Sequence, residues 1–294
     1  MAKSDTLHLQ SYDLATQDIS TVDLNALHAL SISVGWPHRQ VDWQFLRSVG
    51  QGLVALDEIG RVFSSSMWFS HGEDCATIGM VITSPRVQTH GGGRWMMERM
   101  LDECGDRRVI VNSTRAGYAL YISLGFEFQA VVQQMQGTVR AAAALAALGT
   151  EGVEEITPAE LPALLALDRA AFGSDRTNLV SRLAPLSRIV GLRRDGVLQG
   201  YAMRRAFGRG QVIGPIVAQS EEDAIALAAP LLADLEGRFA RVDTRQPEGR
   251  LRSFLLASGL AVFDTVRTLT RGAPLPKVEP GRPGIYGLAA QPLS

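Results

Sequence analysis

The sequence predicts a mixed α/β protein made of two tandem copies of one domain. The chain has 294 residues, 46% of them hydrophobic, which is enough for two domains of about 150 residues that each bury a core. Landmarks recur between the halves at offsets of 136, 135 and 134 residues: Gly60 and Gly196, Ile78 and Ile213, Ser123 and Ala257. So steady an offset is typical of a duplicated domain. In the first half, hairpin strands precede strand–helix–strand units, which indicates a mixed, mostly antiparallel sheet flanked by helices.

Composition excludes several classes of partner. The chain carries 29 Lys and Arg against 30 Asp and Glu, a formal net charge of −1, and both signs are well mixed along it. Such a chain has no electrostatic footprint for nucleic acid or for an anionic membrane. No apolar run approaches the roughly 20 residues of a membrane-spanning helix, and Met1 to Asp5 lack a signal-peptide core. We therefore expect a cytoplasmic protein.

Apolar periodicity and Gly or Pro breaks define the elements of the first half. Strands are predicted over 7–11, 52–56, 61–69, 75–83, 107–112 and 127–134, and helices over 14–34, 40–49, 92–104 and 115–124. The helix over 92–104 has one buried stripe, which ends at Cys104. Cys75 and Cys104 both fall in apolar patterns, which favours buried free thiols over a disulfide or a metal site.

The joint between the halves is an alanine-rich stretch from Arg140 to Leu148, which favours helix and ends in glycines. We therefore expect a first domain over 1–139, a linker over 140–152 and a second domain over 153–294. Thr157, with Glu160 three residues later, predicts the cap of a helix that begins at Pro158. Several prolines between 274 and 283 favour an extended path, after which residues 285–289 could add a last strand.

A glycine-rich loop is the most informative local feature. The apolar strand that ends at Thr83 runs through Pro85 into Gly91-Gly92-Gly93 and then into a helix. Glycines remove the Cβ atoms that would obstruct a ligand, and the first N–H groups of a helix are free to bind an anion. A phosphate seat is the functional interpretation, and a flexible turn is the alternative for a glycine triplet taken alone. The glycine pattern matches neither a Rossmann fingerprint nor a P-loop.

Two ordered motifs carry a family resemblance. Gln88-x-x-Gly91-x-Gly93, three residues after Pro85, is followed by Tyr121-x-x-x-Gly125-Phe126. This arrangement resembles the GCN5-related N-acetyltransferase (GNAT) family, whose members bind acetyl-CoA at the glycine loop. The resemblance implies acetyl-CoA as co-substrate, with no metal required. It implies these cofactor-binding residues: Met80, Val81, Ile82, Gln88, Thr89, His90, Gly91, Gly92, Gly93, Arg94 and Asn112.

The resemblance also implies roles at the reaction centre. Tyr121 would protonate the departing coenzyme A thiolate, although a tyrosine there could equally be a half-buried packing residue. Trp36 falls in the region where the family builds its acceptor wall, and Trp68 lies on a predicted strand nearby, so both are candidates for substrate contact, but tryptophan is more often core. No general base stands out, and a water can serve instead. The histidines show no paired metal-ligand spacing.

The constant offset predicts that the second half lacks the cofactor motif. Gly91 and Gly93 then fall on Ala226 and Ala228, and Tyr121 falls on Leu255. The loop equivalent, residues 219–223, carries three carboxylates, which would repel a pyrophosphate. The run from Leu167 to Arg176, with Ile213-Gly214-Pro215-Ile216-Val217, resembles the carboxyl-terminal domain of bacterial tandem acetyltransferases. We therefore expect a second domain without a cofactor site of its own.

Charged residues of the second half leave two interpretations open. Asp168, Asp175 and Arg176 could belong to an acceptor pocket at the domain seam, or to a helix cap and a solvated face.

The expected function is an N-acetyltransferase that acts on a small-molecule amine, or less favourably on a peptide amine, by direct attack in a ternary complex. A catalytically inactive GNAT-fold protein that senses a ligand or binds a partner is the alternative. Retention of Tyr121 and of the glycine loop favours the enzyme. The sequence fixes neither the acceptor nor the oligomeric state.

Overall fold

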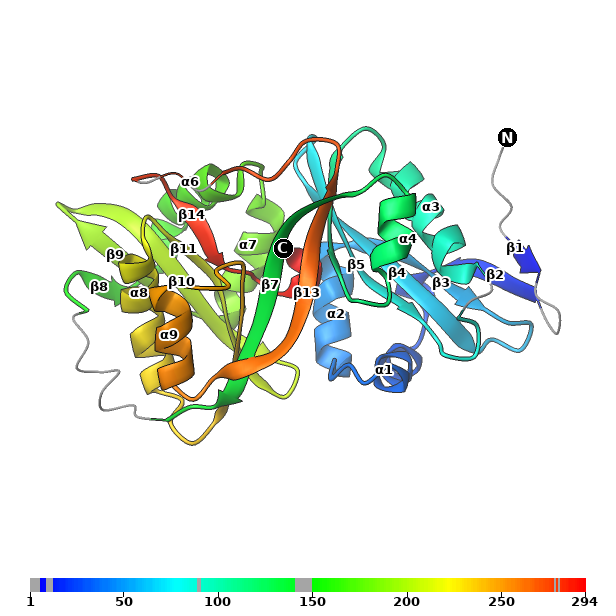
Figure 1. The fold of residues 1–294 in the computed structure, drawn as a ribbon, viewed down its shortest axis with the longest axis horizontal. Helices are drawn as coiled ribbons and strands as arrows, with labels where there is room; N and C mark the ends of the chain where they lie inside the picture. The colour runs from blue at the N-terminus through cyan, green and yellow to red at the C-terminus, as the bar shows by residue number, and fades with distance from the viewer. Residues whose placement is uncertain (1–5, 9–12, 89–90, 141–149, 278, 280) are drawn as a thin grey trace.

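The structure is a computed structural model that describes residues 6–8, 13–88, 91–140, 150–277, 279 and 281–294. The described strands form one continuous 14-stranded sheet with helices on both faces (Figure 1). The first half contains β1 (Thr6–His8), β2 (Asp13–Asp18), α1 (Leu24–Ser33), α2 (Gln40–Val49), β3 (Gln51–Leu56), β4 (Val62–His71), β5 (Cys75–Thr83), α3 (Gly92–Cys104), β6 (Arg108–Ser113), α4 (Tyr118–Ser123) and β7 (Glu127–Thr138).

The second half repeats this order of elements. It contains β8 (Val153–Glu155), α6 (Leu161–Phe172), α7 (Thr177–Leu183), β9 (Arg188–Arg194), β10 (Val197–Phe207), β11 (Gly210–Ala218), α8 (Glu221–Ala233), β12 (Phe239–Thr244), α9 (Arg250–Ala257), β13 (Ala261–Arg271) and β14 (Gly284–Gly287). Short 3-10 helices are η1 (Ile19–Thr21), η2 (Pro158–Glu160), η3 (Ala184–Leu186) and η4 (Gln291–Leu293). The repeat predicted from the offsets is confirmed, as is the α/β class.

Most sequence-predicted elements are present, with one clear error. The helix predicted over 14–34 is wrong at its start, because Asp13–Asp18 is the strand β2 and α1 begins only at Leu24. Two aspartates punctuate this stretch, since Asp18 caps η1 and Asp23 caps α1 through its carboxylate. The alanine-rich helix predicted between 140 and 149 lies outside the described residues. The predicted capping box is confirmed, with the Thr157 N–H donating to Glu160 at 2.8 Å.

The two halves exchange strands at the centre of the sheet. The strand order is β1-β2-β3-β4-β5-β6-β13-β7-β12-β11-β10-β9-β8. The second half's β13 therefore lies between β6 and β7 of the first half, and β7 lies between β13 and β12 of the second. Figure 1 shows β7 and β13 running side by side across the middle of the molecule. Each half is thus completed by a strand of the other.

The helices divide the hydrophobic core between the two faces of the sheet. Side chains of α3 and α4 pack on one face, and α8 and α9 pack on the same face in the second half. The helices α1, α2, α6 and α7 share a single core cluster on the opposite face that continues from one half into the other. We call these the α3 face and the α1 face. The shared cluster means that the seam between the halves is core rather than a polar contact between separate domains.

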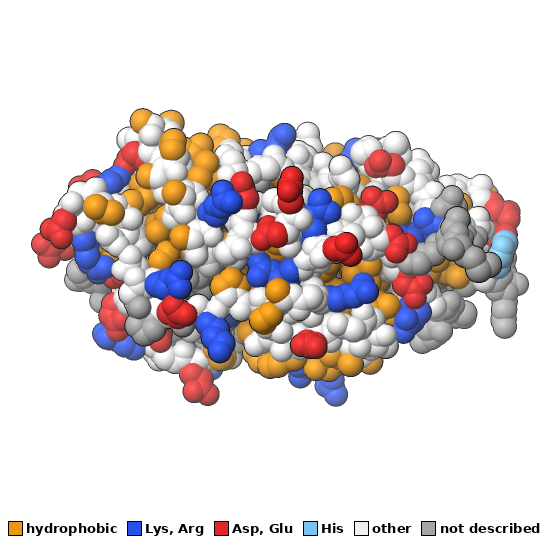
Figure 2. All heavy atoms as spheres, turned by 90° about the horizontal axis from the view of Figure 1, so that it is seen from above, with side chains coloured by type: hydrophobic (Ala, Val, Ile, Leu, Met, Phe, Trp, Pro, Cys, Tyr) orange, Lys and Arg blue, Asp and Glu red, His pale blue; other side chains and the backbone are white. Residues whose placement is uncertain are grey.

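Both cysteines are buried and free, as predicted. Burial raises the pKa of Cys104 to about 12 and also raises that of Cys75, so both remain thiols at neutral pH. Among the described helices, none is long and apolar enough to cross a bilayer. The face of the molecule in Figure 2 carries basic and acidic side chains interspersed.

The strand exchange predicts that the halves do not fold separately. A fragment of residues 1–140 leaves β6 and β7 with no strand between them, so unpaired edges and exposed core should make it unfolded or aggregated. Mixing or coexpressing it with residues 150–294 should restore one complex. Circular dichroism, thermal melting and size-exclusion chromatography would check this. A cooperative thermal transition from a soluble, monomeric 1–140 fragment would contradict the exchanged arrangement.

Candidate active site

The strands β5 and β6 pair for only part of their length and then diverge. Their parallel pairing runs from Cys75–Arg108 to Ile78–Val111 and stops there. We call the separation beyond Ile78 and Val111 the splay, and the point where pairing stops its apex. A bulge in β5 begins at the apex, where the β4–β5 register shifts and Met80 takes a φ of +51°. A non-glycine residue in this conformation is strained, and such residues often lie at functional sites.

The glycine loop leads from the open end of the splay into α3. Gly91 is the N-cap of α3 with φ +83°, and open space surrounds the position where its Cβ would be. The first helical bond runs from the Trp95 N–H to the Gly91 carbonyl at 3.0 Å. The N–H groups of Gly92, Gly93 and Arg94 therefore precede any intrahelical acceptor and lie at the positive end of the helix dipole.

Two side chains beside this loop form hydrogen bonds with the rest of the first half. Gln88 donates from Nε2 to the Thr83 carbonyl at 2.9 Å, which holds the loop against the end of β5. The Arg94 guanidinium donates to Ser123 Oγ on α4 at 2.6 Å. Thr89 and His90 lie outside the described residues.

Tyr121 packs beside the apex on the α3 face. It shares a core cluster with Ile78, Val81 and Val111, and only 7% of it is exposed. Its ring lies edge-on to Phe126, with centroids 5.7 Å apart. Its hydroxyl makes no hydrogen bond to a described residue, and burial raises the pKa of the phenol above its usual range. Tyr121 is therefore a protonated phenol beside the apex of the splay.

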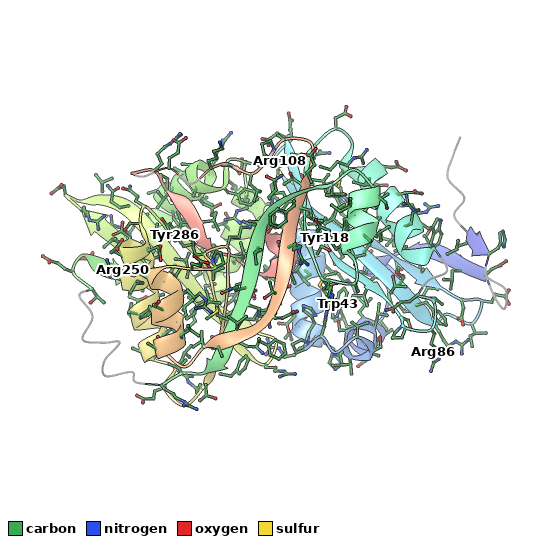
Figure 3. All side chains as sticks on the ribbon, in the orientation of Figure 1. Trp43, Arg86, Arg108, Tyr118, Arg250 and Tyr286 are labelled. Carbon is green, nitrogen blue, oxygen red and sulfur yellow. The ribbon has the colours of Figure 1, made fainter. Side chains whose placement is uncertain are left out.

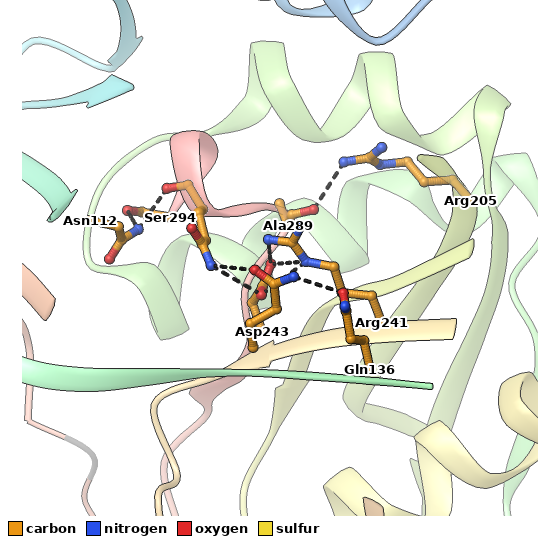
Figure 4. A network of polar contacts seen from close by, with 9 residues as sticks. Asn112, Gln136, Arg205, Arg241, Asp243, Ala289 and Ser294 are labelled. Atoms are coloured by element: carbon orange, nitrogen blue, oxygen red, sulfur yellow. Dashed lines mark hydrogen bonds and ion pairs between the residues drawn. The ribbon is translucent and has the colours of Figure 1, made fainter. Parts of the chain in front are cut away.

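Asn112 follows the apex on β6 and contacts the end of the chain. Its Nδ2 donates to the Gln291 carbonyl at 2.6 Å and to Ser294 Oγ at 3.2 Å, while its Oδ1 accepts from Thr268 on β13. Figure 4 shows this network extending from Asn112 through the carboxyl-terminal segment to Asp243 and Arg241. The segment 288–294, which we call the tail, is therefore part of the site, and nothing in its sequence predicted this.

The two tryptophans predicted at an acceptor wall lie on opposite faces of the sheet. Trp36 packs against the core of the α1 face, with its ring edge-on to His38 at 5.7 Å. Trp68 packs on the α3 face, where the Arg107 guanidinium lies over its ring. Strand alternation explains this, because Met67 takes the α1 face of β4 and its neighbour must take the other. They cannot line one wall.

A buried ion pair lies at the seam between the halves. Arg176 is 1% exposed and forms a two-bond pair with Asp168, which also accepts from the Tyr201 hydroxyl at 2.5 Å. The Arg176 Nη1 donates to the Ser294 carbonyl at 2.5 Å. Asp175, in contrast, caps the Thr177 N–H from an exposed position. Of the three charged residues singled out in the sequence, two are thus buried beside the tail and the third is a cap.

A further buried arginine at the seam, Arg205, was not identified from the sequence. Arg205 is 5% exposed, lies over the rings of Phe45 and Phe207, and donates to the Ala289 carbonyl at 3.0 Å. Burial lowers its pKa to about 10. The signal in the sequence is the pair Arg204-Arg205 between apolar residues of β10, although it does not show which of the two is buried. Among the described residues, no group of His, Cys, Asp and Glu side chains is placed to hold a metal ion.

The corresponding splay of the second half is filled by the protein itself. There β11 pairs with β12 only at Gln211–Ala240 and Val212–Arg241. Beyond this point β14 pairs with β11, as the predicted last strand, while Thr244 Oγ1 on β12 donates to the Tyr286 carbonyl at 2.6 Å. Figure 3 labels Tyr286 on this strand.

The second half also lacks the glycine loop. Residues 84–91 connect β5 to α3, but only Gln219 and Ser220 connect β11 to α8. The constant offset therefore fails here: Ser220, not Ala226, takes the N-cap place of Gly91. The match of Tyr121 with Leu255 holds, because each carbonyl accepts from the residue five positions later, Phe126 and Leu260.

Carboxylates in the first turn of α8 bind within the protein. Glu221 accepts from the Leu251 N–H at the start of α9 at 2.7 Å, and Asp223 pairs with Arg194. Glu222 pairs with Arg250, which Figure 3 labels at the start of α9. Negative charge is favourable at a helix N-terminus, so these carboxylates stabilise the start of α8. They would repel a pyrophosphate from the same place.

The chain is similar to known acetyltransferases in sequence and in fold. A family model described as an acetyltransferase (GNAT) domain matches residues 164–282, which run from α6 through β13. The uncharacterized N-acetyltransferase YitH of Bacillus subtilis is 26% identical over 246 residues, 80% of this chain and 84% of that protein. That similarity extends beyond the second half.

Solved structures share the fold at low identity. A Pyrococcus horikoshii protein with a provisional acetyltransferase assignment has a TM-score of 0.79 at 17% identity, over 99% of both chains. A tandem GNAT protein from the clavulanic acid biosynthesis pathway has a TM-score of 0.60 at 15% identity, over 87% of this chain and 98% of that one. The chain therefore has the fold of the tandem GNAT proteins, and residues 164–282 of its second half match the model of a GNAT acetyltransferase domain.

Proposed function

We propose that the protein is an N-acetyltransferase that transfers the acetyl group of acetyl-CoA to the primary amine of a small molecule, and that the reaction takes place in its first domain. One observation carries this proposal. The free N–H groups at the start of α3, the divergent edge of β5 and the protonated Tyr121 all surround one splay. In the second half, β14 lies in the equivalent place.

The cofactor would bind mostly through main-chain groups. Its pyrophosphate would accept from the N–H groups of Gly92, Gly93 and Arg94, and its pantetheine would pair with β5 from Met80 to Ile82 as an added strand would. Its thioester would then lie at the apex, near Asn112 and Tyr121.

The chemistry requires only transfer between two bound substrates. The amine nitrogen bonds to the thioester carbonyl carbon, the carbon–sulfur bond breaks, and the thiolate takes a proton from Tyr121. The Tyr121 phenolate then regains a proton from water, which restores the enzyme. A main-chain N–H of the bulged β5 segment stabilises the oxyanion, and water accepts the proton that the amine loses. The acceptor would approach from the α1 face, where Trp36 lies.

Replacing Gly91 by Glu should abolish acetyl-CoA binding, because the side chain adds bulk and negative charge at the phosphate seat. Isothermal titration calorimetry would measure this. Gly60→Glu is a matched control, since Gly60 has φ +80° against +83° for Gly91 and no described residue lies within 4 Å of the Cβ position of either glycine. Equal strain thus accompanies both changes. Tight binding by Gly91→Glu would contradict the seat.

Replacing Tyr121 by Phe should keep acetyl-CoA binding but lower turnover by roughly 10²-fold or more, the usual contribution of a general acid. Thiol release from acetyl-CoA across a panel of small amines would measure turnover. Tyr118→Phe is the control. Tyr118 lies one helical turn before Tyr121, and its ring packs under the Arg267 guanidinium. Unchanged turnover in Tyr121→Phe would remove the acid role. Acetyl-CoA binding without thiol release for any amine would favour a ligand sensor.

A further inference from the structure

The tail crosses the apex of the first-domain splay on the α1 face. η4 reaches both strands of the splay: Pro292 packs against Gly79 on β5, and Gln291 and Ser294 accept hydrogen bonds from Asn112 on β6. A Cβ added at Gly79 would lie 2.6 Å from the Pro292 Cα. The two contacts begin one residue after the last paired residues, Ile78 and Val111. The tail therefore bridges the strands where they start to diverge.

The direction of the bound cofactor follows from the phosphate seat. The α3 N-terminus lies beyond Thr83, so a pantetheine arm would run back along β5 from Thr83 toward Gly79. Four residue steps of a strand span about 13 Å. The acyl group at the far end of that arm would then meet whatever closes the apex, which is Pro292.

The tail is fixed rather than ready to move aside. Leu288, Ala289, Ala290 and Leu293 are fully buried, and Ser294 is 1% exposed. Its main chain accepts hydrogen bonds from Arg205 at Ala289, from Asn112 at Gln291 and from the buried Arg176 at Ser294. Figure 4 shows Arg205 and Asn112 reaching the tail from opposite sides. Displacing it would take the Ala289 acceptor from the buried Arg205 and one of the acceptors from the buried Arg176, which is costly.

We propose that Pro292 sets the length of acyl group that the first domain accepts, so that acetyl-CoA fits at the apex and long acyl-CoA esters such as hexanoyl-CoA bind more weakly. This inference rests on the proposed function, since it assumes an acyl-CoA ester in the splay. It makes the end of the second domain a specificity element of the first.

Binding of an acyl-CoA series tests this without knowledge of the acceptor. Calorimetry of the full chain with acetyl-, butyryl- and hexanoyl-CoA should give a preference for acetyl over hexanoyl of roughly tenfold or more, the usual range for excess methylenes in a tight pocket. Pro292→Gly should reduce that preference to within about threefold by opening the apex. Free coenzyme A, which lacks the acyl group, should bind both proteins equally.

A matched control variant and a check of folding keep the test decisive. Pro276→Ala changes a proline that also packs against a glycine, with its Cγ 2.6 Å from the Cβ position of Gly173, and it should keep the wild-type preference. Glycine is chosen at position 292 because alanine would keep the Cβ that meets Gly79, and binding of free coenzyme A below the variant's thermal midpoint shows that Pro292→Gly is folded. Acetyl-CoA binding with no length preference, or with one that the folded Pro292→Gly variant retains, would overturn this inference alone. Absence of binding by every ester would overturn the proposed function with it.

Discussion

The exchange of β7 and β13 at the centre of the sheet is the constraint on which the rest of this structure depends. Neither half has a complete sheet alone, because β13 separates β6 from β7 and β7 separates β13 from β12. The seam is consequently filled like a protein interior, with a shared core on the α1 face and the buried Asp168–Arg176 pair. A rigid seam allows the chain's last residues to pass from the second domain into the first. Without it, η4 would have no fixed position at the apex.

The two copies have diverged in a physically consistent way. In the first, a long loop and glycines leave helix N–H groups free, and β5 keeps an edge unpaired beyond Ile78. In the second, the loop is two residues long, carboxylates bind at the helix starts, and β14 occupies the equivalent edge of β11. Main-chain groups that a cofactor could satisfy in one copy are satisfied by the chain itself in the other. The family match to residues 164–282 thus reports fold in a half whose cofactor groups are already occupied.

Local patterns predicted the repeat, the strand and helix positions around Gly91, and the Thr157 cap, because periodicity and capping chemistry act over a few residues. The start of α1 was misjudged because β2 is short and buries a single side chain, Leu14, so its sequence has no clear alternation that would separate a strand from a helix. The offset between the halves failed at the glycine loop, where an insertion changes the register. Strand exchange and the placement of Pro292 against Gly79 join residues more than 100 apart in the sequence, and one sequence carries no local signal for such pairings.

Hydrogen exchange with and without acetyl-CoA is the most direct test of the claim that a single cofactor site lies in the first domain. Peptides that cover residues 79–94 should gain protection, because the edge of β5 and the first turn of α3 would donate to the cofactor. Peptides that cover 213–223 should exchange at the same rate with and without acetyl-CoA. The edge of β11 already pairs with β14, and carboxylates of the protein already lie at the start of α8. Protection of 213–223 upon acetyl-CoA addition, with none over 79–94, would place the site in the other copy and contradict the account.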